Sequence, residues 1–266
     1  MQWVLGLDGG GTKTDLAAAP LQGGPFPQVR VGGSSLSRSS AAEVSRELAQ
    51  GLQTLLAPTG LAAEQCSAVC AGFASAGSGG NCRVYKAILA DLLPSARVAV
   101  LTDAELAWRG ATRTEEGIVV IAGTGSIAWG RYRGRTAQAG GGGPGHDPGS
   151  GDWIGRRAVE AGLHPPPAGG NFAALMPELV AHPGLAPILD DAGRLLAQLL
   201  QHCAEELAWS EPVAFPVGGI FAHFPAVRTA LARHWGHPLL SPIASPIAAA
   251  LALARVPVTS HSAPLC

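Results

Sequence analysis

Three consecutive glycines follow an aspartate near the start of the chain, in the stretch Asp8-Gly9-Gly10-Gly11-Thr12-Lys13. Glycines accept positive φ angles, so the backbone amides of such a turn can approach an anion closely. The Thr12 hydroxyl would add a hydrogen-bond donor, and the Asp8 carboxylate could hold a hydrated Mg²⁺ ion. The stretch is therefore a candidate phosphate site, although a plain hairpin turn accounts for this one motif equally well.

Two familiar phosphate-binding motifs are absent at this position. The Walker pattern GxxxxGK[ST] needs four residues between its glycines, and here the glycines are adjacent. The Rossmann pattern GxGxxG is missing too, and residues 12–17 alternate like a strand rather than opening a helix. A phosphate bound here would therefore be held by a hairpin turn. The Lys13 side chain could either approach that phosphate or point into solvent.

Two further glycine motifs lie in comparable places later in the chain. Gly123-Thr124-Gly125-Ser126 follows an apolar segment, and Gly218-Gly219 lies between a predicted strand and a predicted helix. Two Gly/Thr turns that face one cleft would hold a polyphosphate from both sides, and the small Gly218-Gly219 pair would let an adenosine lie against the backbone. Because the three motifs together are far more specific than any one, they predict a nucleotide-phosphate site.

The elements that must position these motifs follow from the periodicity of apolar residues. In the first half, a capping-box pattern at Ser40 and Glu43 opens a helix that ends before Pro58, and Asn81 can cap a second helix. Strands are expected at 3–7, 12–17, 29–31, 68–73 and 98–101. The first two would form a hairpin around the glycines.

The second half begins in a similar way. Strands are expected at 117–122 and 127–132, with the turn at 123–126 between them, and residues 140–151 are so rich in glycine that they predict a loop. Helices are expected at 153–161, 191–207 and 247–255, and a short strand at 215–217. Each half thus opens with a strand–glycine turn–strand unit, which indicates a weak internal duplication with a cleft between the halves.

Composition narrows the class of protein. Of 266 residues, 47% are apolar and 14% are charged, so a sizeable core is expected, and the net charge of −1 gives no reason to expect nucleic acid. The five cysteines form no CxxC pair or zinc-site spacing. No secretory signal is expected, and no apolar run reaches the ~18 residues of a membrane span. A cytoplasmic protein is the default expectation.

The chain resembles the sugar kinase/actin/heat-shock-ATPase superfamily and, within it, the N-acetylglucosamine kinase group, also called the BadF/BadG/BcrA/BcrD ATPase family. The stretches that carry the resemblance span nearly the whole chain in the expected order: LGLDGGGTKTD (5–15), LTDAELAWRGA (101–111), GIVVIAGTGSIAWG (117–130), HDPGSGDWIGRRAV (146–159) and PVGGIF (216–221). Spacing is normal for the family except between 160 and 212, which is shorter than usual.

The resemblance implies an α/β protein with a duplicated ribonuclease-H-like, actin-like ATPase fold. Its two lobes, 1–104 and 105–266, would surround a nucleotide cleft that holds ATP and Mg²⁺, with the last helix able to pack back on the first lobe. By the same resemblance Asp8 supports the metal, Thr12 contacts the γ-phosphate, Thr124 and its neighbours form the second phosphate turn, and Gly218 and Gly219 line the adenosine site.

Asp103, in the Thr-Asp-Ala triplet after a predicted strand, matches the general base of the family. The role is chemically reasonable, because a sugar hydroxyl is a poor nucleophile that loses its proton as the phosphoryl group transfers. A carboxylate at a strand end beside the γ-phosphate can accept that proton. Asp103 could also serve as the N-cap of a helix over 104–110, and the two roles are compatible.

The residues expected to contact a sugar are where the chain departs from the family pattern. Family members usually carry GGWG followed by GDEGSGYW, and here residues 140–153 read GGGGPGHDPGSGDW. Asp147 matches a sugar-contacting aspartate, with Gly143 nearby. The usual asparagine of a second contact is missing from 33–37, where Ser35 is the candidate, and Ser75 belongs to a small-residue loop over 74–80 that resembles the sugar loop of the family.

Three functions are consistent with these residues. The leading hypothesis is an ATP-dependent kinase that phosphorylates a hydroxyl of an amino sugar such as N-acetylglucosamine or glucosamine. The alternatives are an ATPase that activates a dehydratase or reductase, which would need cysteines for an iron–sulfur cluster, and a non-catalytic sugar or nucleotide sensor. The expected partner is a small-molecule sugar, without nucleic acid or membrane, and a homodimer is left open.

Overall fold

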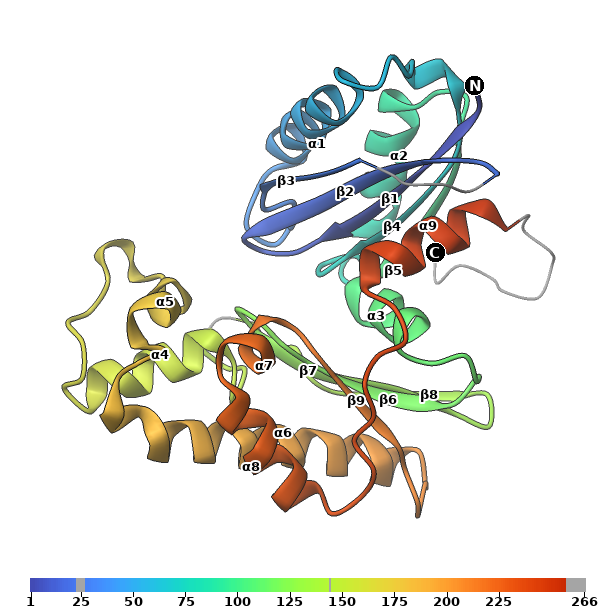
Figure 1. Cartoon of the computed structure of the whole chain (residues 1–266). Coiled ribbons are helices and arrows are strands. Elements are labelled where there is room, and N and C mark those ends of the chain that lie inside the picture. Colours follow the sequence, from blue (N-terminus) through green and yellow to red (C-terminus); the bar gives the residue numbers. More distant parts are fainter. Residues whose placement is uncertain (23–26, 144, 257–266) are drawn as a thin grey trace. The chain divides into compact units, whose positions relative to one another are not determined.

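The computed structural model describes residues 1–22, 27–143 and 145–256, and its chain forms two compact units (Figure 1). Unit 1 consists of Met1–Gly110 together with the segment that begins at Ala244, and unit 2 consists of Ala111–Ile243. The chain thus changes unit after Gly110 and again after Ile243, whereas the sequence placed one boundary after residue 104.

Unit 1 is built on a five-stranded sheet with the order β3-β2-β1-β4-β5. Its strands are β1 (Trp3–Gly9), β2 (Lys13–Pro20), β3 (Gln28–Gly32), β4 (Cys66–Phe73) and β5 (Arg97–Thr102). The first three strands pair antiparallel, and β1, β4 and β5 run parallel. The predicted hairpin and its third strand are therefore confirmed, and the carboxyl ends of β1, β4 and β5 meet at one edge of the sheet.

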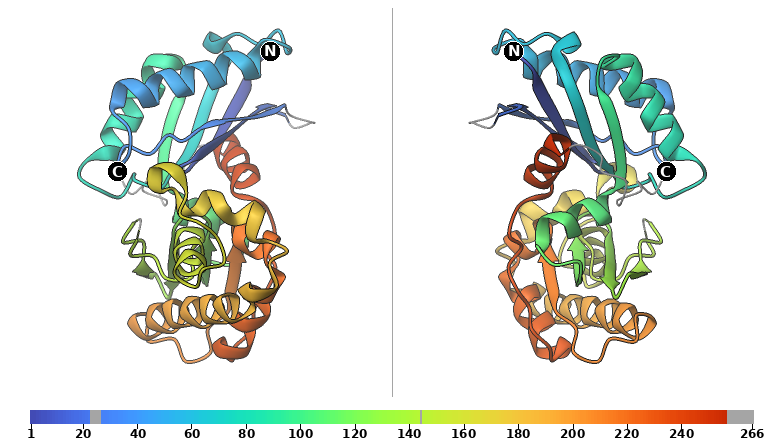
Figure 2. Two further views of the ribbon diagram at one scale, coloured as in Figure 1. Left: turned by 90° about the vertical axis from the view of Figure 1, so that its left-hand side faces the viewer. Right: turned by 90° about the vertical axis from the view of Figure 1, so that its right-hand side faces the viewer.

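Helices cover both faces of the unit 1 sheet (Figure 2). Successive side chains of a strand point to opposite faces, so Leu5 packs in the cluster with α1 and α2, while Val4 packs in the cluster with α3 and α9. The helices are α1 (Ala41–Leu56), α2 (Asn81–Leu92), α3 (Asp103–Ala111) and α9 (Pro246–Arg255). The last helix of the described chain thus completes the core of the first unit.

The ends of α1 and α2 test two predictions. The capping box of α1 is confirmed, because the Ser40 hydroxyl accepts from the Glu43 N–H and the Glu43 carboxylate accepts from the Ser40 N–H at 2.8 Å. The prediction that Asn81 caps α2 is wrong: Gly80 is the N-cap, with a φ of 82°, and the Asn81 side-chain amide donates to the Ser75 carbonyl. The positive φ explains the glycine there, because only glycine adopts it without strain.

Unit 2 is built on a four-stranded sheet with the order β8-β7-β6-β9. Its strands are β6 (Gly117–Ala122), β7 (Ser126–Tyr132), β8 (Arg135–Gly140) and β9 (Ala214–Val217). The first three in chain order pair antiparallel, and β9 lies parallel to β6. The hairpin around Gly123–Ser126 is confirmed. Strand β8 was not predicted, because the stretch RTAQAG offers only alanines for burial and ends in the glycine-rich region.

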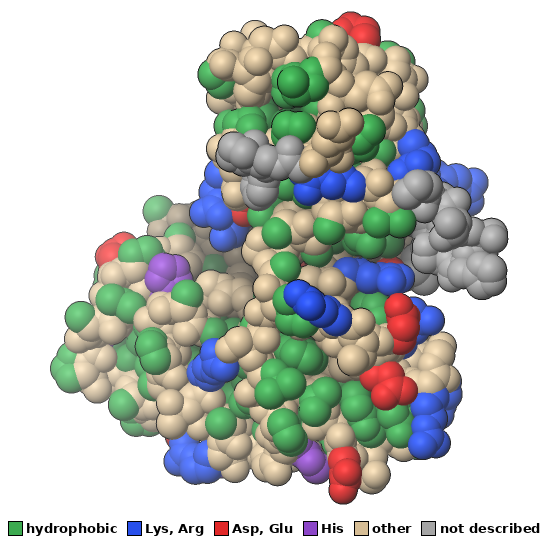
Figure 3. Space-filling view, turned by 45° about the vertical axis from the view of Figure 1, so that its right-hand side comes forward, with side chains coloured by type: hydrophobic (Ala, Val, Ile, Leu, Met, Phe, Trp, Pro, Cys, Tyr) green, Lys and Arg blue, Asp and Glu red, His purple; other side chains and the backbone are tan. Residues whose placement is uncertain are grey.

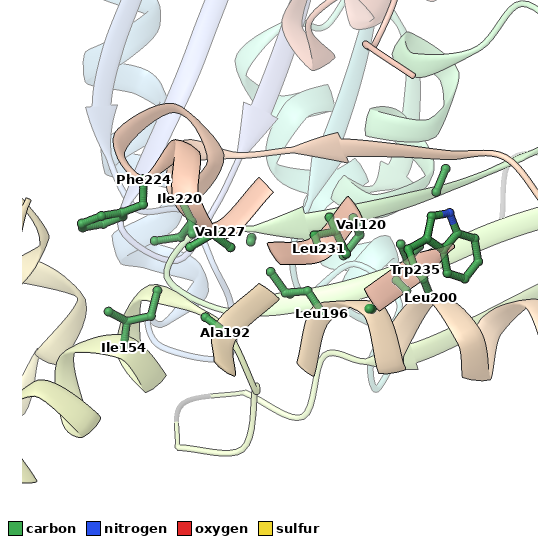
Figure 4. Close-up of a cluster of buried hydrophobic side chains, with 14 of the residues drawn as sticks. Val120, Ile154, Ala192, Leu196, Leu200, Ile220, Phe224, Val227, Leu231 and Trp235 are labelled. Carbon is green, nitrogen blue, oxygen red and sulfur yellow. The ribbon is translucent and has the colours of Figure 1, made fainter. Parts of the chain in front are cut away.

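A helical layer packs on the sheet of unit 2. Its members are α4 (Gly151–Glu160), α5 (Met176–Leu179), α6 (Ala186–Glu206), α7 (Gly219–His223) and α8 (Pro225–Trp235). Leu196 and Leu200 of α6 pack with Val227 and Leu231 of α8 (Figure 4). At Gly193 a Cβ atom would stand 2.5 Å from the Ala230 side chain, so this glycine lets the two helices cross closely.

None of the helices in the described ranges is both long enough and apolar enough to cross a bilayer. On the face that Figure 3 shows, basic and acidic side chains are interspersed with apolar ones, in keeping with a net charge of −1.

Candidate active site

The glycine turn of unit 1 connects β1 to β2 and is tightly anchored. The Gly10 N–H donates to the Lys13 carbonyl at 2.9 Å and closes the turn. The Gly10 carbonyl accepts from the Ser34 N–H at 3.1 Å, and the Gly9 carbonyl accepts from the Ala74 N–H at 3.0 Å. The turn is therefore fixed to the segments that follow β3 and β4, and it is not a flexible connection.

Space, rather than backbone conformation, explains Gly9 of this turn and Gly33, which packs against it. Gly9, Gly10 and Gly11 all lie outside the positive-φ region, so the expectation that their value lay in positive φ angles is wrong. At Gly9 a Cβ atom would collide with the Phe73 ring and stand 2.5 Å from the Ser34 hydroxyl. At Gly33 it would collide with the Gly11 carbonyl. The glycines let three segments of backbone approach one another.

Asp8 lies at the end of β1, beside other acidic groups. Burial and, to a smaller extent, the negative charges of Asp103 and Asp15 raise the pKa of Asp8 to about 7, while Lys13 and Arg30 act in the opposite direction. Asp15 faces Asp8 across the hairpin and is held by Arg30, whose guanidinium donates to both carboxylate oxygens at 2.7 and 2.9 Å. Lys13 is exposed, yet its charge acts on Asp8.

The Asp8 carboxylate fits a magnesium ion that arrives with a nucleotide. Its side chain forms no hydrogen bond with the described residues, and burial beside two other carboxylates makes its charge costly. A cation would relieve that cost. No cluster of three or more His, Cys, Asp or Glu side chains with metal-site geometry occurs in the described ranges. Mg²⁺ commonly uses one or two carboxylates plus substrate phosphates, so a protein-only cage is not required.

Asp103 is the first residue of α3, directly after β5. Burial raises its pKa to about 6, although one oxygen accepts from the Ala104 N–H at 2.8 Å. The contact typical of an N-cap is made by its neighbour: the Thr102 hydroxyl accepts from the Glu105 N–H at 3.1 Å. Thr102 therefore caps α3, and the Asp103 carboxylate, whose charge reaches Asp8, has no equivalent structural duty.

The loops expected to contact a sugar in unit 1 are joined by buried hydroxyl groups. Ser75 accepts from the Leu36 N–H at 3.0 Å and shares a 2.7 Å hydrogen bond with the Tyr85 hydroxyl. Tyr85 donates to the Ser34 carbonyl at 2.8 Å and accepts from Leu36 at 2.9 Å. Ser35 is also buried and bonds to the Ser37 hydroxyl at 2.8 Å. These hydroxyls hold the two loops together, a network that no sequence motif indicated.

The glycine turn of unit 2 is anchored to the start of α4. The Gly123 N–H donates to the Gly125 carbonyl at 2.9 Å, and the Gly123 and Thr124 carbonyls accept from Gly151 and Asp152 at 2.7 and 3.2 Å. The Ser126 hydroxyl donates to the Pro148 carbonyl at 2.6 Å. The turn and the glycine-rich loop before α4 therefore form one structure.

Asp147 organises that loop. It is buried, and one carboxylate oxygen accepts from the Gly143 N–H at 3.1 Å. Burial raises the pKa of Asp147, while hydrogen bonds from the Ser126, Gly143 and Gly142 backbone lower it. The other oxygen lies 2.5 Å from the point where a Cβ of Gly125 would stand, so only glycine fits there. Asp147 thus connects the second glycine turn to the predicted sugar-contacting loop.

Asp152 replaces the aromatic residue of the family pattern, and the structure shows what it does. One of its oxygens accepts from the Gly145 N–H at 3.0 Å and from the Arg156 Nε at 2.8 Å. Arg156 also lies over the Phe172 ring, with its Cζ 4.4 Å from the ring centroid. The altered loop is therefore held by an ion pair between Asp152 and Arg156.

Gly218 and Gly219 follow β9, beside the end of β6. Gly218 has a φ of 115°, and a Cβ there would collide with the Ala122 carbonyl. Gly219 begins α7 and has only the His223 ring within 4 Å of its Cβ position. Because β6 and β9 are parallel neighbours, this pair and the turn at 123–126 lie at the same edge of the unit 2 sheet. Ligands of open α/β sheets bind at such edges.

A cavity of about 340 Å³ lies elsewhere in unit 2. Its lining includes Gln201, Glu205, Trp209, Trp235 and His237, and none of the site residues predicted from the sequence. It is separate from the glycine turn and from the Gly218 edge, so it does not alter the assignment of the site.

Comparison with known proteins decides the family. The model of the BadF/BadG/BcrA/BcrD ATPase family matches residues 5–165, which is more than half of the chain. The chain belongs to this family. A curated relative, an N-acetylmuramic acid/N-acetylglucosamine kinase from Clostridium acetobutylicum, is 38% identical over 167 residues, which are 61% of this chain and 54% of the relative. The chain therefore spans about half the length of the curated relative it matches.

Two solved structures resemble the chain over nearly its whole length. A proposed N-acetylglucosamine kinase from Chromobacterium violaceum is 26% identical, with a TM-score of 0.74 over 95% of this chain and 99% of that one. Another, from Porphyromonas gingivalis, is 19% identical, with a TM-score of 0.77 over 95% and 98%, and shows the fold alone. The α/β fold that the family resemblance implied, the duplicated ribonuclease-H-like fold of actin-like ATPases, is confirmed.

Proposed function

We propose that this BadF/BadG/BcrA/BcrD ATPase family protein is an ATP-dependent kinase that transfers the γ-phosphoryl group to a hydroxyl of an amino sugar. N-acetylglucosamine, glucosamine and N-acetylmuramic acid are the acceptors to consider, because the curated relative is described as a kinase of the first and the last of these. The observation that carries the proposal is the pair Asp8 and Asp103, two partly buried carboxylates at the same edge of the unit 1 sheet whose charges interact.

The two carboxylates suit different steps of phosphoryl transfer. Asp8 would hold a Mg²⁺ ion, which would neutralise part of the negative charge of the phosphates. Asp103 would accept the proton of the sugar hydroxyl. At the same time the hydroxyl oxygen would bond to the γ-phosphorus, and the bond between the γ-phosphorus and the bridging oxygen of ADP would break. A pKa of about 6 leaves Asp103 deprotonated at neutral pH and more basic than an ordinary aspartate, which is suitable for a general base.

The glycine turns would bind the nucleotide. In unit 1 the turn Gly9–Lys13, with the Thr12 hydroxyl, would take the γ-phosphate. In unit 2 the turn Gly123–Ser126 would take phosphate as well, and Gly218 with Gly219 would admit the adenosine. The support is physical: both turns are held by backbone hydrogen bonds, so their amide groups are ordered before a ligand arrives.

We propose the residues that contact the sugar from hydrogen bonds of the same kind. In unit 1 we place the sugar at the loops of Ser35 and Ser75, whose own hydroxyls position the loops. In unit 2 we assign Asp147 and Gly143 to the sugar, because they form one hydrogen-bonded loop beside the second glycine turn. The chemistry of acceptor choice would then depend on backbone groups and on Asp147 more than on the serine hydroxyls.

Three of the cysteines do not support the alternative of an iron–sulfur ATPase activator. Cys66, Cys70 and Cys203 are free and buried, and burial raises the pKa of each thiol to about 12. All three side chains lie inside the hydrophobic cores of the two units, where they are not presented to a cluster shared between subunits.

A coupled ADP-release assay with Mg²⁺-ATP tests the kinase proposal. The panel would contain N-acetylglucosamine, glucosamine, N-acetylmuramic acid and glucose, and sugar-dependent ADP release is expected with at least one amino sugar. Asp103→Asn should abolish that release, while Asp91→Asn, a control at an exposed residue of α2, should leave it unchanged. Sugar-dependent release that persists in Asp103→Asn would show that the base is misassigned.

A further inference from the structure

We propose that Arg38 binds an anionic group of a substrate beside the glycine turn of unit 1. The shared chemistry is an oxyanion, which could be the carboxylate of an acidic amino sugar or the γ-phosphoryl group of ATP. The inference deepens the proposed kinase function and rests on it. Arg38 belongs neither to the glycine turns nor to the candidate sugar-contacting residues.

Arg38 lies directly against the glycine turn. A Cβ atom built on Gly11 would stand 3.3 Å from the Arg38 Nε and 3.5 Å from its Cζ, so the guanidinium lies in close contact with this glycine. Gly11 is the residue before Thr12, the proposed γ-phosphate contact. An anion held by the amide groups of this turn would therefore lie within reach of the guanidinium.

The charge of Arg38 is not neutralised by the protein. Its side chain is exposed and makes no hydrogen bond or ion pair with a described residue. The other basic groups of this region act on carboxylates: Arg30 binds Asp15, and Lys13 lowers the pKa of Asp8. Arg38 is absent from the charges that act on Asp8 and Asp103. All five N–H donors of its guanidinium therefore remain for a ligand.

The backbone that carries Arg38 is rigid. The Arg38 N–H donates to the Ser35 carbonyl at 3.0 Å, and the Leu36 N–H donates to both Ser75 and Tyr85. Tyr85 is fully buried and stacks on the Phe73 ring at a centroid distance of 3.9 Å. Phe73 also touches Gly9. One aromatic pair thus supports both the glycine turn and the turn that presents Arg38, which lowers the entropic cost of binding.

Arginine is suited to this task. The planar guanidinium matches the two oxygens of a carboxylate or phosphoryl group, which gives strong, directional binding, and it stays charged at every working pH. Replacement by glutamine removes the charge and keeps much of the length. Replacement by lysine keeps the charge and removes the two-pronged geometry, so Arg38→Lys should restore only part of the affinity that Arg38→Gln loses.

Isothermal calorimetry on the full chain with two matched ligand pairs tests the proposal. N-acetylmuramic acid differs from N-acetylglucosamine by a lactyl carboxylate, and Mg²⁺-AMPPNP differs from Mg²⁺-ADP by the terminal phosphoryl group. We expect Arg38→Gln to weaken binding of the more anionic member of at least one pair by about tenfold, and to leave the other member within about twofold. The pair that responds identifies the source of the oxyanion. Arg46→Gln, at an exposed position of α1, is the matched control and should change nothing.

Two outcomes would overturn the assignment: unchanged affinities for all four ligands in Arg38→Gln, or an equal loss for all four, which would indicate a structural effect. Calorimetry does not require turnover, so the inference and the kinase proposal fail separately. If the wild-type protein phosphorylates a sugar and Arg38→Gln binds as the wild type does, only the inference is wrong. If no sugar is phosphorylated but the affinities change as expected, only the kinase proposal is wrong.

Discussion

The two glycine turns are both hairpin turns at the edge of a sheet, yet they use their glycines differently. In unit 1, Gly9 is in close contact with Phe73 and Ser34, and acidic side chains lie around the turn. In unit 2, a Cβ on Gly123 would meet no atom within 4 Å, and the turn is fixed by backbone bonds to the start of α4. The first glycine of the turn is thus crowded in unit 1 and open in unit 2, where the tight position is Gly125, beside the Asp147 carboxylate.

The difference indicates that the two units of the duplicated fold are suited to different tasks, the chemical step in unit 1 and binding in unit 2. The residues suited to bond making, Asp8 and Asp103, both belong to unit 1, where burial raises the pKa of each. In unit 2 two buried acids lie beside the turn, Asp147 and Asp152, and both are already bound: backbone amides donate to each, and Arg156 also donates to Asp152. We therefore expect substitutions in unit 1 to affect the chemical step and those in unit 2 to affect binding.

The largest expected effect is that of Asp103→Asn. An amide cannot accept the proton of the acceptor hydroxyl, so kcat should fall by about 10²–10⁴-fold, while the Kd for Mg²⁺-AMPPNP stays within about twofold. Steady-state kinetics and calorimetry measure the two quantities. In unit 2, Asp147→Asn should instead act mainly on the KM for the sugar. Equal losses of kcat in both variants would remove the proposed division.

The second prediction compares the glycines directly. Gly9→Ala should destabilise the protein by about 1–3 kcal/mol, because the new methyl group collides with the Phe73 ring. Gly123→Ala should change stability by less than about 0.5 kcal/mol, since its Cβ position is open and its φ is not positive. Thermal and denaturant unfolding provide the measurement. Similar destabilisation by the two substitutions would show that the turns are equivalent after all.

The third prediction concerns the charge of Asp8. A carboxyl group with a raised pKa binds more protons in the folded than in the unfolded state between pH 4 and pH 7, so its contribution to stability falls as pH rises through that window. Asp8→Asn should therefore stabilise the metal-free protein by roughly 1–2 kcal/mol at pH 8. The gain should shrink as the pH falls and vanish near pH 3, below both pKa values, where the carboxyl is protonated in both states. Unfolding in EDTA at both pH values measures it, and a gain that is independent of pH would contradict the assignment.

The smallest effect is a pH dependence of the wild-type reaction. With a pKa of about 6, Asp103 loses its basic form as the pH falls, so kcat/KM should drop about tenfold for each pH unit below 6. A pH–rate profile with an amino sugar and saturating ATP measures this limb. A profile that remains flat down to pH 5 would place the proton acceptor elsewhere.

Much of the fold follows from local patterns in the sequence. Alternating and 3.6-residue periodicities, with turn residues between them, predict both hairpins, α1 and α6. Strand β8 and the short helices between residues 168 and 185 were missed. Strand β8 buries only alanines and stands next to a glycine-rich loop, so its pairing with β7 depends on the neighbouring strand and not on its own composition.

The candidate site was predictable to the extent that motifs mark it. The glycine turns and Asp103 could be found from residue type and position. The hydroxyl network of Ser75 and Tyr85 could not, since its members come from different elements and leave no spacing pattern. Arg38 was missed for the same reason, because its neighbour Gly11 lies in another loop.

The sequence by itself determined where strands, helices and turns form and which residues could carry phosphate chemistry, because those properties depend on near neighbours in the chain. Only the tertiary structure decided that Gly9 is needed for space, that Thr102 rather than Asp103 caps α3, and that Asp152 holds the altered loop. These outcomes depend on hydrogen-bond geometry and on contacts between segments that the fold brings together. A local pattern of residue types does not reveal such contacts, since they arise only when sheets and helices have packed.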